Sequence, residues 1–439
     1  MKYFLPPNIF HSGTLVELKV RSDDYLYLER CTGREDTFLP LLKTLVLKLA
    51  FISCGKMEMF LRSFPVLEEL SIDATEWIVC DEYVSSETLR KLTINSYGFG
   101  EEIGTLVELK VRSDDYLYLE RCTGREDTFL PLLKTLVLKL AFISCGKMEM
   151  FLRSFPVLEE LSIDATEWIV CDEYVSSETL RKLTINSYGF GEEMLSLKSI
   201  SFDTPRLVYF DYCDYVAEDY PKVNLTNVVE ALLNLRLTED QYRQARAQKD
   251  DQDDVLLRFR NVWKLLSGLR HVQKLYLSCY TLEALSLCCE SIPVFNNLKV
   301  LRISSYKDQG WQAMPVLLRN CPLLETLVLE GLVHYVTDRC GDACDCVPGG
   351  NKGRSLISCP VKKLQIKRFE GKKRELEMIK HFLESFRCLK EMEIHAREDN
   401  PIHYFQIPRE FELFNELYSC DVRFLVRGSL YKRRGLLST

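Results

Sequence analysis

Residues 39–47 of the chain read LPLLKTLVL, and residues 64–72 read FPVLEELSI. Each stretch contains the pattern Leu-x-x-Leu-x-(Leu/Ile), and its last two apolar residues are separated by a residue that can face water. Such alternation predicts a short β-strand with one buried face. Between the two stretches, residues 57–64 place apolar side chains at the i, i+3, i+4 and i+7 positions of an amphipathic helix, which Pro65 ends. The local unit is therefore strand, helix, strand, with parallel strands.

The strand pattern recurs along the chain. Its first apolar residues are Leu15, Leu42, Leu67, Leu89, Val272, Leu298, Leu324, Val361 and Leu389. The first four lie 27, 25 and 22 residues apart, and the next three lie 26 residues apart. Repeats of roughly 20–29 residues with this pattern are leucine-rich repeats (LRRs). One repeat cannot bury its apolar face alone, so the repeats must stack on one continuous core. The sequence predicts an α/β fold, an LRR solenoid with a curved parallel sheet and outer helices, whose leucines are core residues.

A second repeat is longer and perfect. Residues 13–102 and residues 104–193 are identical at all 90 positions, at an offset of 91. Structural selection would not hold every exposed residue identical, so we interpret the repeat as a recent duplication or an error in assembling the gene. A lengthened binding surface is the alternative. At the junction, Leu89 and Leu106 are only 17 residues apart, which predicts a tight turn or a kink.

Composition excludes several classes of protein. With 46% hydrophobic residues the chain has ample material for a core, so disorder along its whole length is excluded. No run reaches the roughly 18 apolar residues of a membrane span, and we identify no secretory signal in residues 1–10. The 17 cysteines are then best explained as free thiols in a reducing compartment. We expect an intracellular protein, cytoplasmic or nuclear, that is not secreted and binds no membrane.

The net charge carries little information about partners. The chain has a formal charge of −7, and each copy of the duplicated segment carries 10 basic and 16 acidic residues. One segment counted twice therefore accounts for most of the acidity. A balance of this kind gives no reason to expect a nucleic acid partner.

Four stretches together resemble a known family. They are residues 39–72; IPVFNNL at 292–298 with GWQAMPVLLRNCP at 310–322; LVLEGLVH at 327–334 with CGDACDC at 340–346; and CPVKKLQI at 359–366 with Gly371, a helix at 375–386 and LKEMEI at 389–394. This combination is similar to the plant F-box/LRR-repeat family with a C-terminal FBD domain, and the similarity runs from about residue 5 to about residue 426. It implies a non-enzymatic protein that resembles the substrate-recognition part of a cullin–RING (SCF-type) ubiquitin ligase.

The start of the chain departs from that family. Its members begin with an F-box, a small helical module that docks on the ligase adaptor. Residues 1–12 instead look like a lead-in to the first LRR strand, so the adaptor-binding residues of the family have no positions here. The alternative reading is an F-box-less, truncated or duplicated family member without a ligase role, acting as a competitor, a regulator or a non-functional product.

The expected organisation follows from these patterns. It comprises a lead-in at 1–12, LRR copies at 13–102 and 104–193, further LRR units at 194–340 with a charged insertion at 238–254, a Cys/Gly loop at 341–358, an FBD-like domain at 359–426 and a basic tail at 427–439. The insertion predicts a solvated loop or an exposed helix end. An amphipathic helix should follow it, with Leu256, Phe259, Val262 and Leu266 on one face. In the FBD-like helix, Leu376, Ile379, Leu383 and Phe386 should line the buried face and His381 should lie on the polar side.

Few residues suggest chemistry. The metal candidates are Cys340, Cys344, Cys346 and Cys359. Zinc prefers four Cys or His ligands in C-x2–4-C pairs, and only the first two cysteines fit that spacing, so we favour an ordinary loop. A reactive or disulfide-forming group is the other alternative. No arrangement of nucleophile and base has a recognisable signature, so we predict no enzyme, no catalytic residue and no cofactor.

The concave face is the expected binding surface, for a protein partner that the sequence does not identify. Its exposed strand positions include Glu17, Lys19, Lys43, Thr44, Glu68, Glu69, Lys91 and Thr93, with their copies 91 residues later. These residues mix both signs of charge, so they can discriminate between partners by charge complementarity.

Overall fold

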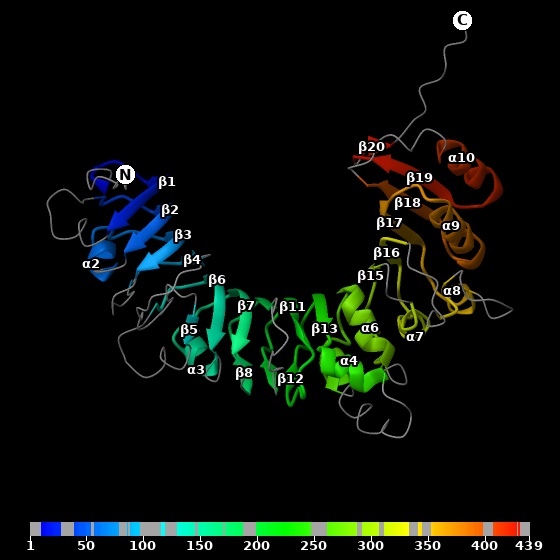
Figure 1. Ribbon diagram of the computed structural model, residues 1–439, viewed down its shortest axis with the longest axis horizontal. Coiled ribbons are helices and arrows are strands. Elements are labelled where there is room, and N and C mark those ends of the chain that lie inside the picture. The colour runs from blue at the N-terminus through cyan, green and yellow to red at the C-terminus, as the bar shows by residue number, and fades with distance from the viewer. Residues whose placement is uncertain are drawn as a thin grey trace, which may run out of the picture. The chain divides into compact units, whose positions relative to one another are not determined.

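The structure is a computed structural model of residues 1–439. It describes residues 10–27, 39–53, 57–78, 86, 88–96, 116–118, 130–144, 148–169, 172–187, 199–246, 261–287, 292–306, 311–332, 341–344, 353–397, 407–427 and 429–430. The chain divides into two compact units, unit 1 at 1–225 and unit 2 at 226–439. In both units, parallel strands that follow one another along the chain lie side by side (Figure 1).

Unit 1 contains a long parallel sheet and a short one. The long sheet runs through β1 (Glu17–Tyr27), β2 (Thr44–Ser53), β3 (Glu69–Ile78), β4 (Lys91–Ser96), β6 (Thr135–Ser144), β7 (Glu160–Ile169), β9 (Lys182–Ser187) and β11 (Tyr209–Tyr215). The short sheet joins β8 (Glu173–Ser176), β10 (Ile200–Asp203) and β12 (Val223–Asn224). Helices α2 (Met57–Arg62) and α3 (Met148–Arg153) follow β2 and β6. The predicted α/β LRR fold is confirmed.

The leucine pattern forms the core of unit 1 from Leu42 onward, as predicted, but the prediction is wrong for the first strand, where Leu15, Leu18 and Val20 are only half-buried. Leu42, Leu45 and Leu47 are fully buried, and their neighbours in β3 are equally enclosed. The helix predicted before Pro65 is α2, and Phe64 just beyond it packs edge-on against Phe60 with ring centroids 4.8 Å apart. The ring of Phe10 lies 5.3 Å from that of Phe60, so the lead-in contributes a side chain that covers the start of the core.

The junction between the two copies leaves the sheet continuous. In copy 1, β2 pairs with β1, with Leu45 beside Leu18. In copy 2, the matching strand β6 pairs with β4, with Leu136 beside Leu92 in the same register. The far end of β6 pairs with β5 (Tyr116–Tyr118), which is the copy of the last part of β1. Residues 97–115, where we predicted a turn or kink, lie outside the described residues.

Unit 2 repeats the same plan. Its parallel strands are β13 (Glu230–Arg236), β14 (Lys274–Leu277), β15 (Val300–Ser304), β16 (Thr326–Glu330), β17 (Lys363–Phe369), β18 (Glu391–Ala396) and β19 (Asp421–Val426), and β20 (Ser429–Leu430) pairs antiparallel with β19. Its helices include α4 (Glu239–Arg246), a helix at 261–268, α6 (Cys279–Leu287), α7 (Met314–Arg319), α8 (Arg354–Ile357), α9 (Lys373–Ser385) and α10 (Ile407–Leu417). Figure 1 shows helices α6 to α9 on one side of this sheet, and we call the side away from these helices the open face of unit 2.

The charged insertion is partly helical. Of the two alternatives for residues 238–254, the exposed helix is correct for α4, because Thr238 and Gln241 exchange hydrogen bonds of 2.9 and 3.2 Å that cap its first turn. Residues 247–254 lie outside the described residues, as do Leu256 and Phe259. In the helix that follows, Val262 and Leu266 are buried as predicted.

The FBD-like end is larger than one strand–helix–strand unit. The predicted unit is present as β17, α9 and β18, and α10 and β19 then add a second unit that we did not predict. The position predicted for His381 is wrong, because this residue is buried and its Nδ1 lies 3.3 Å from the Ser385 hydroxyl. The physical reason is Gly353, before α8, where a Cβ atom would lie 2.6 Å from that hydroxyl. The missing side chain lets α9 bury the side that its sequence marks as polar.

Candidate partner-binding surfaces

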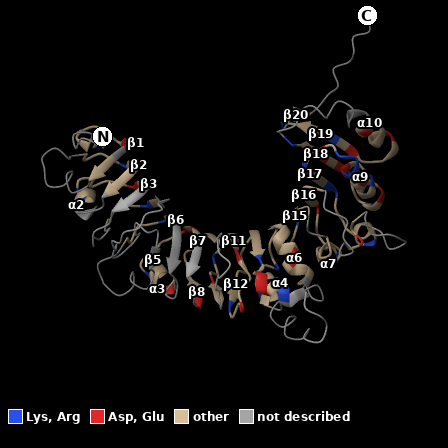
Figure 2. Cartoon of the chain, viewed as in Figure 1, with Lys and Arg blue, Asp and Glu red and all other residues tan. Residues whose placement is uncertain are grey.

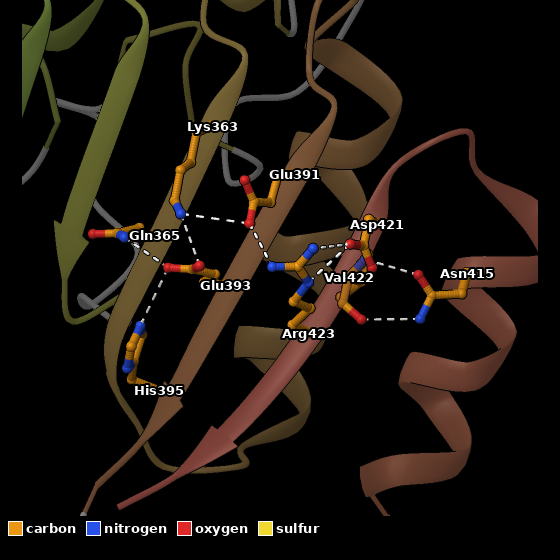
Figure 3. A network of polar contacts seen from close by, with 9 residues as sticks. All are labelled: Lys363, Gln365, Glu391, Glu393, His395, Asn415, Asp421, Val422 and Arg423. Carbon is orange, nitrogen blue, oxygen red and sulfur yellow. Dashed lines mark hydrogen bonds and ion pairs between the residues drawn. The ribbon is translucent and has the colours of Figure 1, made fainter. Parts of the chain in front are cut away.

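The open face of unit 2 carries an ordered network of charges. Strand register places Lys363, Glu391 and Asp421 in one row across β17, β18 and β19. The next row holds Gln365, Glu393 and Arg423. We call these six residues, together with His395, the C-terminal charged face. Figure 2 shows basic and acidic residues interspersed on these strands, and Figure 3 shows the contacts that join them.

Lys363 contacts two glutamates of the C-terminal charged face. Its Nζ atom lies 2.7 Å from Glu393 Oε1 and 3.5 Å from Glu391 Oε1. Gln365 Nε2 donates a second hydrogen bond of 2.7 Å to Glu393. Partial burial acts to raise the pKa of the Glu393 carboxyl, but the hydrogen bonds from Lys363 and Gln365 outweigh it and the pKa is lowered. The carboxylate is therefore held ionised and in one orientation.

Arg423 extends the network to the last parallel strand. Its guanidinium contacts Glu391 at 2.8 Å and Asp421 at 2.6 Å. The strand itself is fixed by Asn415 of α10, which accepts a hydrogen bond of 2.7 Å from the Val422 amide and donates one of 2.9 Å to the Val422 carbonyl. The side-chain amide of α10 thus sets the position from which Arg423 is presented (Figure 3).

A second cluster lies on β14, β15 and β16. The Arg302 guanidinium lies over the Tyr276 ring, 4.9 Å from its centroid, and its Nε donates a hydrogen bond of 2.9 Å to Glu330. The Glu330 side chain is only 7% exposed, whereas Arg302 is 43% exposed. A buried carboxylate thus orients a cation that reaches the solvent.

The predicted surface positions of unit 1 are exposed or half-buried where the structure describes them. Lys43 Nζ lies 2.9 Å from Glu68, and the copies of these residues, Lys134 and Glu159, form the same pair at 2.5 Å. The hydrogen bond from the lysine lowers the pKa of each glutamate. Both copies of the duplicated segment therefore present the same lysine–glutamate pair. The copies of Glu17 and Lys19 lie outside the described residues.

The cysteine candidates are only partly described. Cys340 and Cys346 lie outside the described residues, and Cys344 and Cys359 are buried. Burial raises the pKa of the Cys359 thiol to about 11, so at neutral pH the thiol is protonated and is a poor nucleophile. Among the residues that the structure describes, no three His, Cys, Asp or Glu side chains are grouped so that they could hold a metal ion. The ordinary loop that we favoured over a zinc site stays a prediction.

Sequence reasoning missed both charged clusters of unit 2. The alternation in DVRFLV at 421–426 was the available signal for β19, since Val422 and Phe424 are buried and Asp421 and Arg423 are exposed. No sequence signal marked Glu330 as buried, because an acidic residue at the end of an LRR strand normally faces water.

In the described part of the chain, no helix is long and apolar enough to cross a membrane.

The comparisons with known proteins agree with this architecture. The FBD family matches residues 360–394, which comprise β17, α9 and most of β18. The putative F-box protein At3g58950 of Arabidopsis thaliana is 60% identical over 312 residues, 69% of this chain and 75% of that protein. The F-box/LRR-repeat protein At3g58930 of the same plant is 53% identical over 346 residues, 75% of this chain and 70% of the relative. The F-box/LRR-repeat protein At5g38396 is 52% identical over 311 residues, 69% of this chain and 64% of the relative. With its leucine-ladder core and its FBD segment, the chain belongs to the plant F-box/LRR-repeat family with an FBD domain.

Proposed function

We propose that the chain binds a protein partner on the open faces of its sheets and serves as the substrate-recognition part of an SCF-type ubiquitin ligase, with no catalysis of its own. The C-terminal charged face is the observation that carries this proposal. Seven polar residues from three adjacent strands line one surface there, and ion pairs hold most of them in place. The relatives' names, F-box and F-box/LRR-repeat protein, support the link to the ligase.

The chemistry of this face suits recognition of a protein. Side chains held by neighbours have already lost most of their rotamer freedom, so a partner that contacts them meets a smaller entropic cost. Arg423 and Asp421 remain 46% and 54% exposed and can form further hydrogen bonds with a partner. Charges of both signs in a fixed order favour one complementary surface over others. This role needs no activated nucleophile or metal.

The experiment is affinity purification of the tagged chain from plant cells with mass spectrometry. Wild type is compared with Arg423→Glu and with Lys380→Glu, a matched charge reversal on α9, where Lys380 is 58% exposed and pairs with Glu384. We expect one or more proteins to be captured by wild type and by Lys380→Glu and to be lost with Arg423→Glu, and capture of the ligase adaptor and cullin by all three chains would support the ligase role. Partners without adaptor or cullin would refute the ligase role and leave protein binding. Equal partner sets for all three chains would refute the C-terminal charged face as the binding surface.

A further inference from the structure

We call the side of the long sheet on which exposed strand residues such as Glu69 and Lys91 lie the open face of unit 1, and it has a charge pattern centred on the join between the two copies. Strands β3, β4, β6 and β7 are consecutive neighbours in the sheet. The acidic residues on or next to the two outer strands are Glu68, Glu69 and Asp73 for β3, and Glu159, Glu160 and Asp164 for β7. The basic residues on or next to the two inner strands are Arg90, Lys91, Lys134 and Lys139. We call these ten residues the seam face.

Backbone hydrogen bonds fix the order of these charges. The amide of Arg90 donates to the Glu68 carbonyl at 2.8 Å, that of Lys134 donates to Arg90 at 2.9 Å, and that of Glu159 donates to Lys134 at 2.9 Å. One row across the sheet therefore reads acid, base, base, acid. In the corresponding place of copy 1, β1 puts Glu17 beside Thr44, where β4 puts Lys91 beside Thr135. The pairing at the junction thus replaces an acid by a base.

The side chains of the seam face are accessible to a partner. Lys91 and Glu69 are 48% and 50% exposed and their charged atoms are 3.9 Å apart. Lys134 and Glu159 are 54% and 40% exposed. Ion pairs at such exposure contribute little to stability. A partner that offers charges in the right places can therefore replace or share these pairs at small cost.

The spacing of the strands sets the distances between the charged columns of the seam face. Neighbouring strands lie about 4.8 Å apart, so the acidic columns of β3 and β7, three steps apart, are separated by about 14 Å. The midpoint between β4 and β6 lies about 7 Å from each column. An extended peptide advances about 3.4 Å per residue and points alternate side chains to one side. Residues i, i+2 and i+4 of such a peptide therefore face the first acidic column, the basic centre and the second acidic column.

We infer that the seam face binds an extended segment of a protein partner that crosses the strands and carries base-x-acid-x-base. The outer neighbours continue the match, because Lys43 before β2 and Arg181 before β9 place a base beyond each acidic column. An α-helix fits worse, since about 14 Å corresponds to nine or ten residues, which point to different sides of a helix. This inference rests on the proposed function in one respect, that the open faces bind protein.

The test uses the full chain and a synthetic fluorescent peptide, Asp-Ser-Lys-Ser-Asp-Ser-Lys-Ser-Asp, with binding followed by fluorescence anisotropy at low salt. The reference peptide has the same composition with its two lysines three residues apart. We expect the first peptide to bind about threefold more tightly, because the reference peptide can place only one of its two lysines at an acidic column and each well-placed base contributes about threefold. The preference should shrink as the salt is raised from about 20 mM to about 500 mM.

Matched variants locate the site. Glu69→Lys and its copy Glu160→Lys should each weaken binding of the first peptide about threefold, and both together about tenfold. Glu149→Lys on α3, which lies on a helix and makes the same change of charge, should leave binding unchanged. Equal affinity for both peptides would overturn the inference, as would equal effects of all three variants. An all-acidic peptide that binds more tightly than the first peptide, with an affinity that Glu69→Lys does not change, would also overturn the inference. The binding site would then be the basic residues of the two inner strands alone.

These outcomes are separable from those of the proposed function. If the chain captures adaptor, cullin and a substrate but shows no preference for lysine spacing, the seam face is wrong and the function stands. If the peptides are discriminated while no adaptor is captured, the charge pattern of the seam face stands and the ligase role does not.

Discussion

The pair between Arg302 and Glu330 gives a sharp test of how unit 2 is held together. Glu330 is 7% exposed and Arg302 is 43% exposed, so Arg302→Met leaves an enclosed carboxylate without its cation. Breaking a fully buried pair costs about 3–5 kcal/mol. Because Arg302 is partly in water, we expect a loss of about 2 kcal/mol in the free energy of unfolding. For a unit of roughly 200 residues, this lowers the melting temperature by about 4–5 °C.

Two further variants separate charge from packing in calorimetry of the full chain. The double variant Arg302→Met, Glu330→Met removes the orphaned carboxylate and should melt within about 2 °C of wild type. Lys274→Met removes the exposed pair with Glu230, whose partners are 58% and 42% exposed, and should cost less than about 1 kcal/mol. A single Arg302→Met variant that melts with wild type, or a double variant that melts no higher than the single one, would refute the argument from burial.

Three other predictions concern pH, the core and the thiols. Hydrogen bonds from a lysine, an asparagine and a tyrosine lower the pKa of Asp203, so the stability they give is present above the ordinary Asp pKa of about 3.9 and is lost as the pH falls through the folded value. Melting curves of Asp203→Asn should therefore lose less between about pH 5 and about pH 2.5 than those of wild type, and an equal loss would contradict this. Leu45→Ala and its copy Leu136→Ala, both at fully buried positions, should each cost about 3 kcal/mol in calorimetry, and a clear difference would mean that the copies pack differently. Iodoacetamide at neutral pH should label exposed Cys388 and spare buried Cys359, whose thiol pKa is raised to about 11; peptide mass spectrometry that finds both labelled would disprove the assignment.

The parts of the fold that depend on a repeated apolar pattern were predictable. Leu275 and Leu277 of β14, or Leu364 and Ile366 of β17, are buried because the core must be lined at every repeat, and the spacing of the repeats fixes which strands are neighbours. The exposed positions followed from the same alternation. The apolar period alone therefore suffices to identify the candidate face of unit 1.

The parts that depend on particular contacts were not predictable. His381 is buried because Gly353, almost thirty residues earlier, leaves room for it. Glu330 is buried because Arg302 in the neighbouring strand neutralises it, and the sequence does not pair these two residues. Such contacts depend on which side chains meet across the strands, whereas a periodic pattern reports only which side of each strand is apolar.

The junction of the copies shows how an LRR chain accommodates added sequence. Leu92 beside Leu136 and Ile94 beside Leu138 take the place of Leu18 beside Leu45 and Val20 beside Leu47, with the same register and the same kind of side chain. At this junction β4 can take the place of the β1 strand, because both offer the neighbouring strand a matching ladder of apolar side chains. The open face has no such equivalence, since Lys91 now lies where Glu17 lies in the first copy. An inserted copy is therefore nearly neutral for the core and changes the order of charges on the face, so its effect on the molecule should be sought in binding rather than in stability.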